Sequence, residues 1–301
     1  MLATKDQYLS RFKDLGIEVT CPNVTQTLSE DALIDILPDY NGWIIGDDPV
    51  TKRVLKAGKD GNLRALVKWG IGTDNIDFNA CDELDLPIEN TPGMFGDEVS
   101  DIAIGYLIGL ARETFQIDRE VRKGEWPKLR GISLRNKNVA IVGFGDIGSG
   151  IANKLIAFGM HSIIYDPYAN QSENEYFSFE NWPERLSECD FLVFACELNQ
   201  KTHHMLNQNT LSECKDGVRI VNVSRGGLIN EIDLIDSLRS EKVYSAALDV
   251  FEKEPLQNDS ELKSFDRCIF GSHNSSNTSE AVERTNDIAI KKILRMLAVE
   301  E

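Results

Sequence analysis

The chain has 301 residues, enough for two domains of ordinary size. It carries 49 acidic residues against 32 basic ones, a net charge of −17. That balance argues against binding to nucleic acid or to an anionic membrane surface, since both depend on clustered cations. The amino-terminal segment is too charged for a signal peptide, and the longest apolar stretch, residues 102–111, is too short to span a bilayer. The six cysteines form no C-x-x-C pair and are expected to be reduced thiols of a cytoplasmic protein.

The first third of the chain alternates between helix-like and strand-like patterns. Helices are expected at 6–15, 28–37 and 51–57, with Ser29 as the amino-terminal cap of the second helix. Strands are expected at 17–20, 42–46, 65–69 and 87–90, and a truncated first strand at 1–4. The alternation predicts a parallel sheet covered by helices. A long helix rich in Ile, Leu and Ala is expected at 98–123.

Residues 137–166 combine a strand, a glycine turn, a helix and a second strand that ends in an acid. The strand 139–142 is followed by Gly143, Gly145 and Gly148 in the G-x-G-x-x-G spacing, and Asp166 ends the second strand. Such glycines permit a sharp turn, the approach of a pyrophosphate and close packing of helix on strand. The helix amino terminus offers unpaired N–H groups to phosphates. Because a carboxylate accepts ribose hydroxyls and repels a 2′-phosphate, this unit predicts binding of NAD rather than NADP.

Further strand-like segments follow the nucleotide unit. They lie at 189–196, 219–223, 245–250 and 267–272, and a helix is expected at 279–299. The fold class expected is α/β with two doubly wound parallel-sheet lobes. A Rossmann NAD-binding domain, 98–275, is inserted in a smaller flavodoxin-like substrate domain made of 1–97 and 276–301.

An alcohol dehydrogenation with a nicotinamide needs a proton-transferring base and a cation beside the reacting oxygen. Of the four histidines, His161 lies behind the expected sheet, and His203 and His204 lie in a polar loop that suits exposed residues. His273 follows the last strand, at the sheet edge where such folds bind ligands. Arg225 and Glu254 follow two other strands. Each could singly be an ordinary turn residue, but together with His273 they form a coherent acid/base set.

The chain resembles the D-isomer-specific 2-hydroxyacid dehydrogenases, and among them the phosphoglycerate dehydrogenase-like branch. The motifs that carry the resemblance run over nearly the whole chain. They are KWGIGTDNID (68–77), NTPG (90–93), VGFGDIG (142–148), NVSRGGLIN (222–230), ALDVFEKEP (247–255) and SHNSSNTSEA (272–281).

The resemblance implies specific roles for residues of this chain. Arg225, Glu254 and His273 match the family's catalytic arginine, glutamate and histidine, and Arg225 also contacts the substrate. The residues implied to bind the cofactor are Gly143, Gly145, Asp146, Ile147, Gly148, Asp166, Ser224 and Asp249, the last of them at the nicotinamide carboxamide. Gly70, Ile71 and Gly72 match a loop whose N–H groups hold the substrate carboxylate. A homodimer formed through the region of the long helix is also implied, and no metal is expected.

These features predict reversible hydride transfer between NAD and C2 of a D-2-hydroxy acid, with 3-phosphoglycerate as the first substrate to test. The loop 46–51 carries Asp47 and Asp48, which would repel a phosphate, and Phe95 stands where relatives have Asn. Glyoxylate, hydroxypyruvate or a sugar-derived 2-oxo acid is therefore an open alternative. A second alternative is an NAD-sensing binding protein that resembles a corepressor. Formate oxidation is less favoured, because it would not need Glu254 beside His273.

Overall fold

The structure, a computed structural model, describes residues 6–24, 27–170 and 174–299. The chain divides into two compact units, one made of Met1–Met94 and Asn277–Glu301 and the other of Phe95–Ser276. We call them unit 1 and unit 2 and describe each by itself. The division does not in itself assign substrate binding to one unit and cofactor binding to the other. The first strand expected at 1–4 lies outside the described residues.

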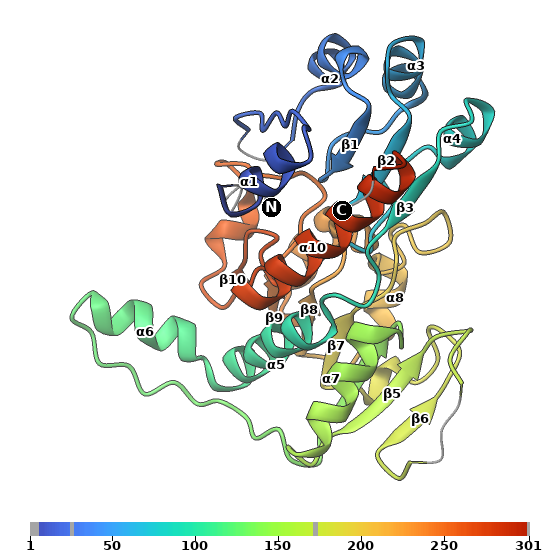
Figure 1. The fold of residues 1–301 in the computed structure, drawn as a ribbon. Helices are drawn as coiled ribbons and strands as arrows, with labels where there is room; N and C mark the ends of the chain where they lie inside the picture. Colours follow the sequence, from blue (N-terminus) through green and yellow to red (C-terminus); the bar gives the residue numbers. More distant parts are fainter. Residues whose placement is uncertain (1–5, 25–26, 171–173, 300–301) are drawn as a thin grey trace. The chain divides into compact units, whose positions relative to one another are not determined.

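Unit 1 is built on a parallel sheet of three strands in the order β1-β2-β3 (Figure 1). The strands are β1 (Gly42–Ile45), β2 (Ala65–Lys68) and β3 (Ile88–Asn90). The helices are α1 (Asp6–Asp14), α2 (Glu30–Ile36), α3 (Lys52–Asp60), α4 (Phe78–Glu83) and α10 (Ser279–Met296), with a 3₁₀ turn at Leu37–Asp39. As expected, Ser29 caps α2 and accepts a hydrogen bond from the Ala32 N–H.

Helices cover both faces of this sheet. Successive side chains of β2 point to opposite faces, and the apolar ones on each face pack against helices. Ala65 and Val67 pack in one cluster with Ile290 of α10, whereas Leu66 packs in another with Leu55 of α3. All five of these side chains are buried. The carboxyl-terminal helix α10 therefore covers one face of a sheet whose strands come from the amino-terminal part of the chain. Figure 1 shows this helix lying across the strands.

Unit 2 contains a seven-stranded parallel sheet in the order β10-β9-β8-β7-β4-β5-β6. Its strands are β4 (Asn138–Val142), β5 (His161–Tyr165), β6 (Phe177–Phe179), β7 (Phe191–Phe194), β8 (Val218–Asn222), β9 (Val243–Leu248) and β10 (Ile269–Phe270). The strand order reverses between β4 and β7, which are neighbours. In parallel sheets of this kind ligands bind at the carboxyl ends of the strands on either side of the reversal.

The helices of unit 2 are α5 (Gly96–Arg112), α6 (Thr114–Arg122), α7 (Asp146–Ile156), α8 (Gln208–Glu213) and α9 (Glu231–Arg239). Short 3₁₀ turns lie at Leu186–Glu188, Gly226–Leu228 and Glu261–Ser264. The largest core cluster joins one face of the sheet to Leu211 of α8 and Leu234 of α9. The glycines of α7 and α5 let these two helices pack closely, since a Cβ on Gly150 would lie only 3.1 Å from the Ser100 Oγ.

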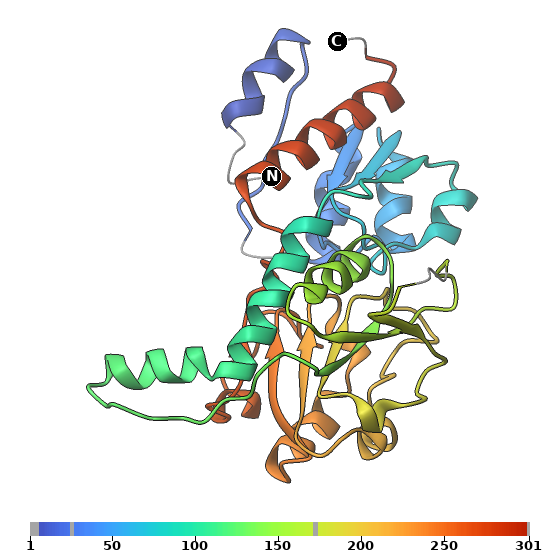
Figure 2. The ribbon, with the colours of Figure 1, turned by 90° about the horizontal axis from the view of Figure 1, so that it is seen from below.

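Three expectations about elements were wrong. Residues 17–20 are extended and turn Ile17 and Val19 toward the α10 core, but they pair with no strand. The helix expected at 98–123 is two helices, because Glu113 adopts a left-handed conformation (φ 56°) that ends α5 and starts α6. The sheet of unit 2 has seven strands rather than six, since β6 pairs with β5. Figure 2 shows α6 and the chain that returns from it projecting from the rest of unit 2 as an arm.

Candidate functional site

The carboxyl ends of the last two strands of unit 2 bring Glu254 and His273 together. The His273 Nδ1 lies 2.8 Å from the Glu254 Oε2, and the other carboxylate oxygen accepts the Phe251 N–H at 3.0 Å. Both side chains are about three-quarters buried, with 25% and 22% of their surface exposed. His273 has a φ of 53°, a left-handed conformation that is uncommon outside glycine and that often marks functional positions. The pair fixes the orientation of the imidazole ring through its Nδ1.

Arg225 follows β8 in the same unit, on a turn that packs tightly against the chain carrying Glu254. Its Nη1 donates to the Ser224 carbonyl at 2.9 Å, and the Asn222 side chain donates to the Arg225 carbonyl at 2.9 Å. A Cβ on Gly226 would lie 1.8 Å from the Phe251 carbonyl carbon. Glycine is therefore required where the turn after β8 meets the turn after β9. The structure thus places all three expected catalytic residues at the carboxyl ends of adjacent strands.

Asp249 is almost completely buried and anchors the turn that carries His273. Its carboxylate accepts the N–H groups of Asn274 (3.3 Å) and Ser275 (3.0 Å), and its carbonyl accepts the His273 N–H at 2.7 Å. Burial, together with the charge and hydrogen bond of Asp249, raises the pKa of the Tyr106 hydroxyl on α5. Sequence reasoning missed Tyr106, since no local pattern links a residue of α5 to a turn so distant in the chain. The expected contact of Asp249 with the nicotinamide stays a prediction.

The glycine turn has the shape that a dinucleotide needs. Gly143 has a φ of +92°, and a Cβ on Gly148 would lie 1.9 Å from the Gly143 carbonyl oxygen, so both positions require glycine. A Cβ on Gly145 would meet nothing within 4 Å, which leaves the backbone open to approach from outside. Gly145 precedes the first turn of α7, and no side chain caps that turn. The N–H groups at this helix end are therefore available to an anion.

Asp166, at the end of β5, lies directly beside the glycine turn. One carboxylate oxygen accepts the Phe144 N–H at 2.7 Å and the other accepts the Tyr168 N–H at 2.8 Å. Each oxygen keeps a further lone pair, so the carboxylate can also accept hydroxyl groups. The fixed carboxylate and the open glycine backbone together fit the adenosine end of NAD.

The other expected cofactor residues lie near the same edge of the sheet. The Asp146 carboxylate lies against the first residue of α5, because a Cβ on Gly96 would be 2.3 Å from its Oδ1. Ile147 is half-buried in the first turn of α7. The Ser224 hydroxyl donates to the Cys196 carbonyl and so joins the chain after β8 to the chain after β7. Contacts of these three residues with a cofactor stay predictions.

The loop Gly70, Ile71 and Gly72 follows β2 in unit 1. Gly70 has a φ of +121°, and its N–H donates to the Thr91 hydroxyl at 2.7 Å. The Asn90 side chain donates to the Ile71 carbonyl at 3.1 Å. Two residues at the end of β3 therefore hold this loop in place, and Ile71 is 48% exposed. Binding of a substrate carboxylate there stays a prediction.

The remaining histidines lie away from the pair. His161 is the first residue of β5, away from the carboxyl ends of the strands as expected, and it stacks on Tyr176 with ring centroids 5.5 Å apart. His204 is not simply an exposed loop residue, because its Nε2 lies 2.5 Å from a Glu252 carboxylate oxygen. Within the described residues, no cluster of three or more His, Cys, Asp or Glu side chains could hold a metal ion. The described helices include none long and apolar enough to cross a membrane.

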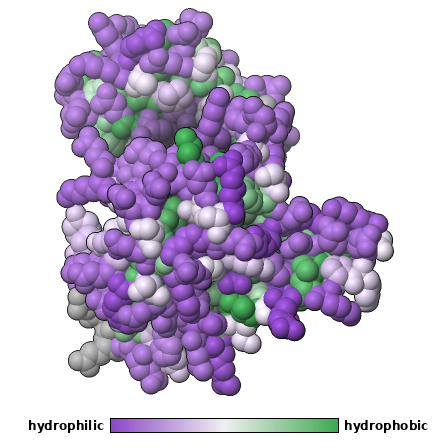
Figure 3. Space-filling model, turned by 180° about the vertical axis from the view of Figure 1, so that it is seen from behind, coloured by the Kyte–Doolittle hydropathy of each residue, from purple (hydrophilic) through white to green (hydrophobic). Residues whose placement is uncertain are grey.

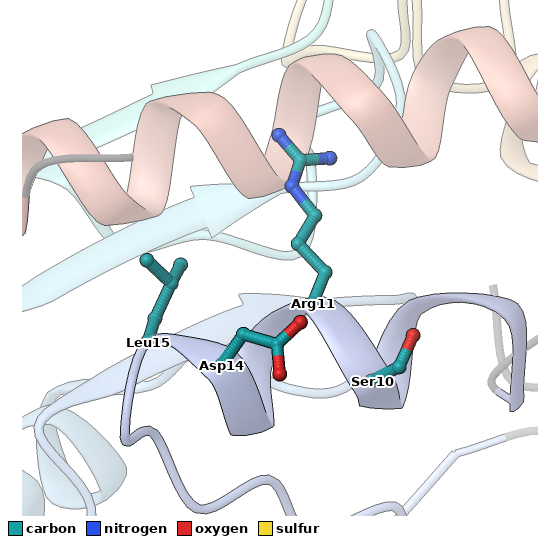
Figure 4. A pocket seen from close by; sticks show the side chains of 4 residues that line it. All are labelled: Ser10, Arg11, Asp14 and Leu15. Atoms are coloured by element: carbon teal, nitrogen blue, oxygen red, sulfur yellow. The ribbon is translucent and has the colours of Figure 1, made fainter.

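A hollow on unit 1 is separate from these residues. Four residues of or next to α1 line it: Ser10, Arg11, Asp14 and Leu15 (Figure 4). Arg11 points toward α10 and lies 3.5 Å from the Asp287 carboxylate. None of the lining residues belongs to a motif that the sequence analysis singled out, so we assign this hollow no function.

Comparisons with known proteins point to one family. Residues 104–275 match the model of the "D-isomer specific 2-hydroxyacid dehydrogenase, NAD binding domain". A hydroxypyruvate reductase of Thermotoga maritima is 34% identical over 290 residues, which are 94% of this chain and 92% of that protein. A D-3-phosphoglycerate dehydrogenase of Archaeoglobus fulgidus is 30% identical over 93% of this chain, but this chain covers only 53% of that protein. The crystal structure of a glyoxylate reductase from Paecilomyes thermophila superimposes with a TM-score of 0.84 at 27% identity, covering 98% of this chain and 92% of that one.

Proposed function

The chain belongs to the D-isomer-specific 2-hydroxyacid dehydrogenase family, and we propose that it reduces a small 2-oxo acid to the D-2-hydroxy acid with NADH. NAD is its cofactor, in keeping with the matched NAD-binding domain. The observation that carries the proposed chemistry is the 2.8 Å contact between His273 and Glu254 in the same unit as the glycine turn. It supplies a proton donor of fixed orientation on the sheet edge where such folds bind ligands.

Each catalytic residue has a role that follows from its contacts. When bound, NADH supplies the hydride to C2 of the substrate. His273 donates a proton from Nε2 to the substrate oxygen, while the Glu254 carboxylate orients the ring and stabilises its protonated form. Arg225, on the neighbouring turn, stabilises the negative charge that develops on that oxygen. In the oxidising direction His273 is the base that takes the hydroxyl proton.

The cofactor would be held by groups that the fold already orients. The open backbone at Gly145 and the first turn of α7 would bind the pyrophosphate, and Asp166 would accept the ribose hydroxyls. The first residue of α7 is Asp146, an acid rather than a cation, so the phosphate contacts would come from backbone N–H groups.

We further propose that the distal group of the substrate is uncharged, as in glyoxylate or hydroxypyruvate, rather than a phosphate. The cations near the loop 46–51 of unit 1 are already paired with carboxylates. Lys68 is buried and lies 3.0 Å from Asp47, Lys52 pairs with Glu83, and Arg53 lies 2.7 Å from Glu30. A phosphate would have to compete with Asp47 for the buried Lys68, and Asp47 and Asp48 would repel it.

The test is an initial-rate panel of 2-oxo acids with NADH, followed by the loss of NADH absorbance. Glyoxylate and hydroxypyruvate should be reduced with kcat/KM at least tenfold above phosphohydroxypyruvate, the 2-oxo acid that corresponds to 3-phosphoglycerate. A preference for the phosphorylated substrate would refute the proposal on the distal group while leaving the reaction class standing. Tight binding of NADH without turnover of any 2-oxo acid would favour the NAD-sensing alternative.

We also propose that the protein is a homodimer formed through the projecting arm. No residue of α6 is buried, although the helix carries the apolar residues Phe115, Ile117 and Val121. Large apolar side chains on the arm are exposed, Phe115 by 44%, Val121 by 42% and Trp126 by 75%. Apolar residues are visible on the arm in Figure 3. Such exposure suits a surface that a second copy covers. A cytoplasmic location and the lack of nucleic-acid or membrane partners stay predictions.

A further inference from the structure

Three glutamates meet around the turn that carries Glu254. Glu231 is the first residue of α9, and its Oε1 accepts the Glu252 N–H at 2.7 Å. The Glu254 Oε1 accepts the Phe251 N–H at 3.0 Å. Neighbouring N–H groups of one turn are thus held by two different carboxylates. Residues 251–254 are therefore fastened to the start of α9 as well as to His273.

A second contact fastens the same turn from another direction. The Glu252 carboxylate lies 2.5 Å from the His204 Nε2, in the loop after β7. The His204 N–H in turn donates to the Gly227 carbonyl at 2.8 Å, in the turn that carries Arg225. The turns after β7, β8 and β9 are therefore joined in one network through Glu252. The position of Glu254 depends on this network because its own turn is short and contains no helix or strand.

The surroundings of Glu231 raise the pKa of its carboxyl group. Burial raises the pKa of its carboxyl group, and the charges of Glu252 and Glu254 act in the same direction, while the hydrogen bond from the Glu252 N–H lowers it. Two of the charges that act on Glu231 therefore belong to the 251–254 turn, to which its carboxylate is hydrogen-bonded. Its ionisation places a further negative charge near Glu254, and a negative charge near the Glu254–His273 pair favours the imidazolium form of His273.

We propose that Glu231 is a positioning residue for the Glu254–His273 pair: its carboxylate fixes the turn that carries Glu254 and places a negative charge beside the pair. The catalytic part of this inference rests on the proposed function. Its electrostatic part concerns the free protein and holds without any substrate.

Two substitutions separate position from charge. In Glu231→Gln the amide oxygen can still accept the Glu252 N–H, but the negative charge is gone. In Glu231→Ala both are lost. The matched control is Asp236→Asn, which removes one acid from the same helix, where Asp236 pairs with Arg239 at 2.6 Å. All three variants would be studied in the full chain.

The first measurement is an NMR titration of the histidine ring protons. The chain has four histidines, and the His273 signal is identified by its loss in His273→Gln. We expect Glu231→Gln to lower the titration midpoint of His273 by roughly a few tenths of a pH unit, and Asp236→Asn to leave it unchanged. An unchanged midpoint in Glu231→Gln would overturn the electrostatic part, whether or not the protein proves to be an active dehydrogenase.

The second measurement is the pH profile of kcat for 2-oxo acid reduction. In Glu231→Gln the alkaline limb should move to lower pH while the plateau rate stays within about threefold of the parent, which corresponds to less than 0.7 kcal/mol. Glu231→Ala should lose at least tenfold in kcat at every pH. Equal rates in Glu231→Ala and the parent protein would overturn the positioning role. Failure of the parent protein to reduce any 2-oxo acid would instead refute the proposed function.

Discussion

Two substitutions in the glycine turn should separate folding stability from cofactor binding. Gly148→Ala should lower the stability, whereas Gly145→Ala should weaken the binding of NADH. Gly148→Ala places a methyl group 1.9 Å from the Gly143 carbonyl oxygen, whereas Cβ atoms in proteins stay at least 3.0 Å from such neighbours. Helix α7 and strand β4 would have to separate by roughly 1 Å in a buried, close-packed region. Gly145→Ala meets nothing within 4 Å and has a φ of −73°, which alanine adopts freely.

These geometries give expected magnitudes. Overpacking at Gly148 should cost about 2–3 kcal/mol of folding free energy, which lowers Tm by roughly 5–10 °C for a domain of this size. Gly145→Ala should change the free energy of unfolding by no more than about 0.5 kcal/mol. Its methyl group nevertheless stands where the pyrophosphate approaches the backbone. We therefore expect the Kd for NADH to rise at least tenfold, about 1.4 kcal/mol.

Thermal unfolding with and without NADH, together with calorimetric titration of NADH, measures both quantities. For Gly145→Ala the Tm of the free protein should match the parent, while the increase in Tm produced by NADH should be smaller. Gly105→Ala is the control, because this helical position is also open to a methyl group and lies outside the turn. Unchanged NADH affinity in Gly145→Ala would refute the assignment of the pyrophosphate site to this turn.

Three further predictions concern other parts of the chain. Tyr106→Phe should lower the free energy of unfolding by about 1–3 kcal/mol and reduce kcat, because the buried Asp249 carboxylate loses a hydrogen-bond donor. Unfolding in urea and steady-state kinetics measure these two effects, and parent-like values of both would contradict the prediction. Trp126→Glu should turn the dimer into a monomer in sedimentation velocity, whereas a parent protein that already sediments as a monomer would end that proposal. Burial acts to raise the pKa of Asp190, but hydrogen bonds from Lys215 and a backbone N–H outweigh it and lower the pKa. Asp190→Asn should therefore be less stable than the parent at neutral pH, with the difference narrowing as the pH falls below about 4, and denaturant melts across that range would detect it.

The repeating elements of the fold were predictable because each carries its own local pattern. The strands β4 and β7 are short, mainly apolar runs buried on both faces, and such runs are typical of parallel sheets. The strand expected at 17–20 was wrong because its alternation reflects packing beneath α10 rather than pairing with another strand. Strand β6 was missed because three half-buried residues give too short a signal. The break at Glu113 was missed because the apolar pattern of 98–123 shows no glycine or proline at that point.

The candidate site was predictable only where residues follow strands. Arg225, Glu254 and His273 each come shortly after a strand of one sheet, and parallel strands bring their carboxyl ends to one edge. Tyr106, Glu231 and the pairing of His204 were not predictable in the same way. Each contacts a residue far away in the sequence, and helical or loop spacing gives no sign of which turn it will meet. Whether the site residues act as proposed stays a prediction.

Proton donation by His273 is tested most directly by single-turnover reduction of glyoxylate by His273→Gln with NADH already bound. The account predicts that this variant binds NADH with a Kd within about threefold of the parent, while its rate of hydride transfer at neutral pH falls at least a thousandfold, about 4 kcal/mol. A variant that transfers hydride at the parent rate would contradict the account, since the proton would then come from another group. Loss of NADH binding would likewise contradict it, because His273 would then hold the cofactor rather than the substrate oxygen.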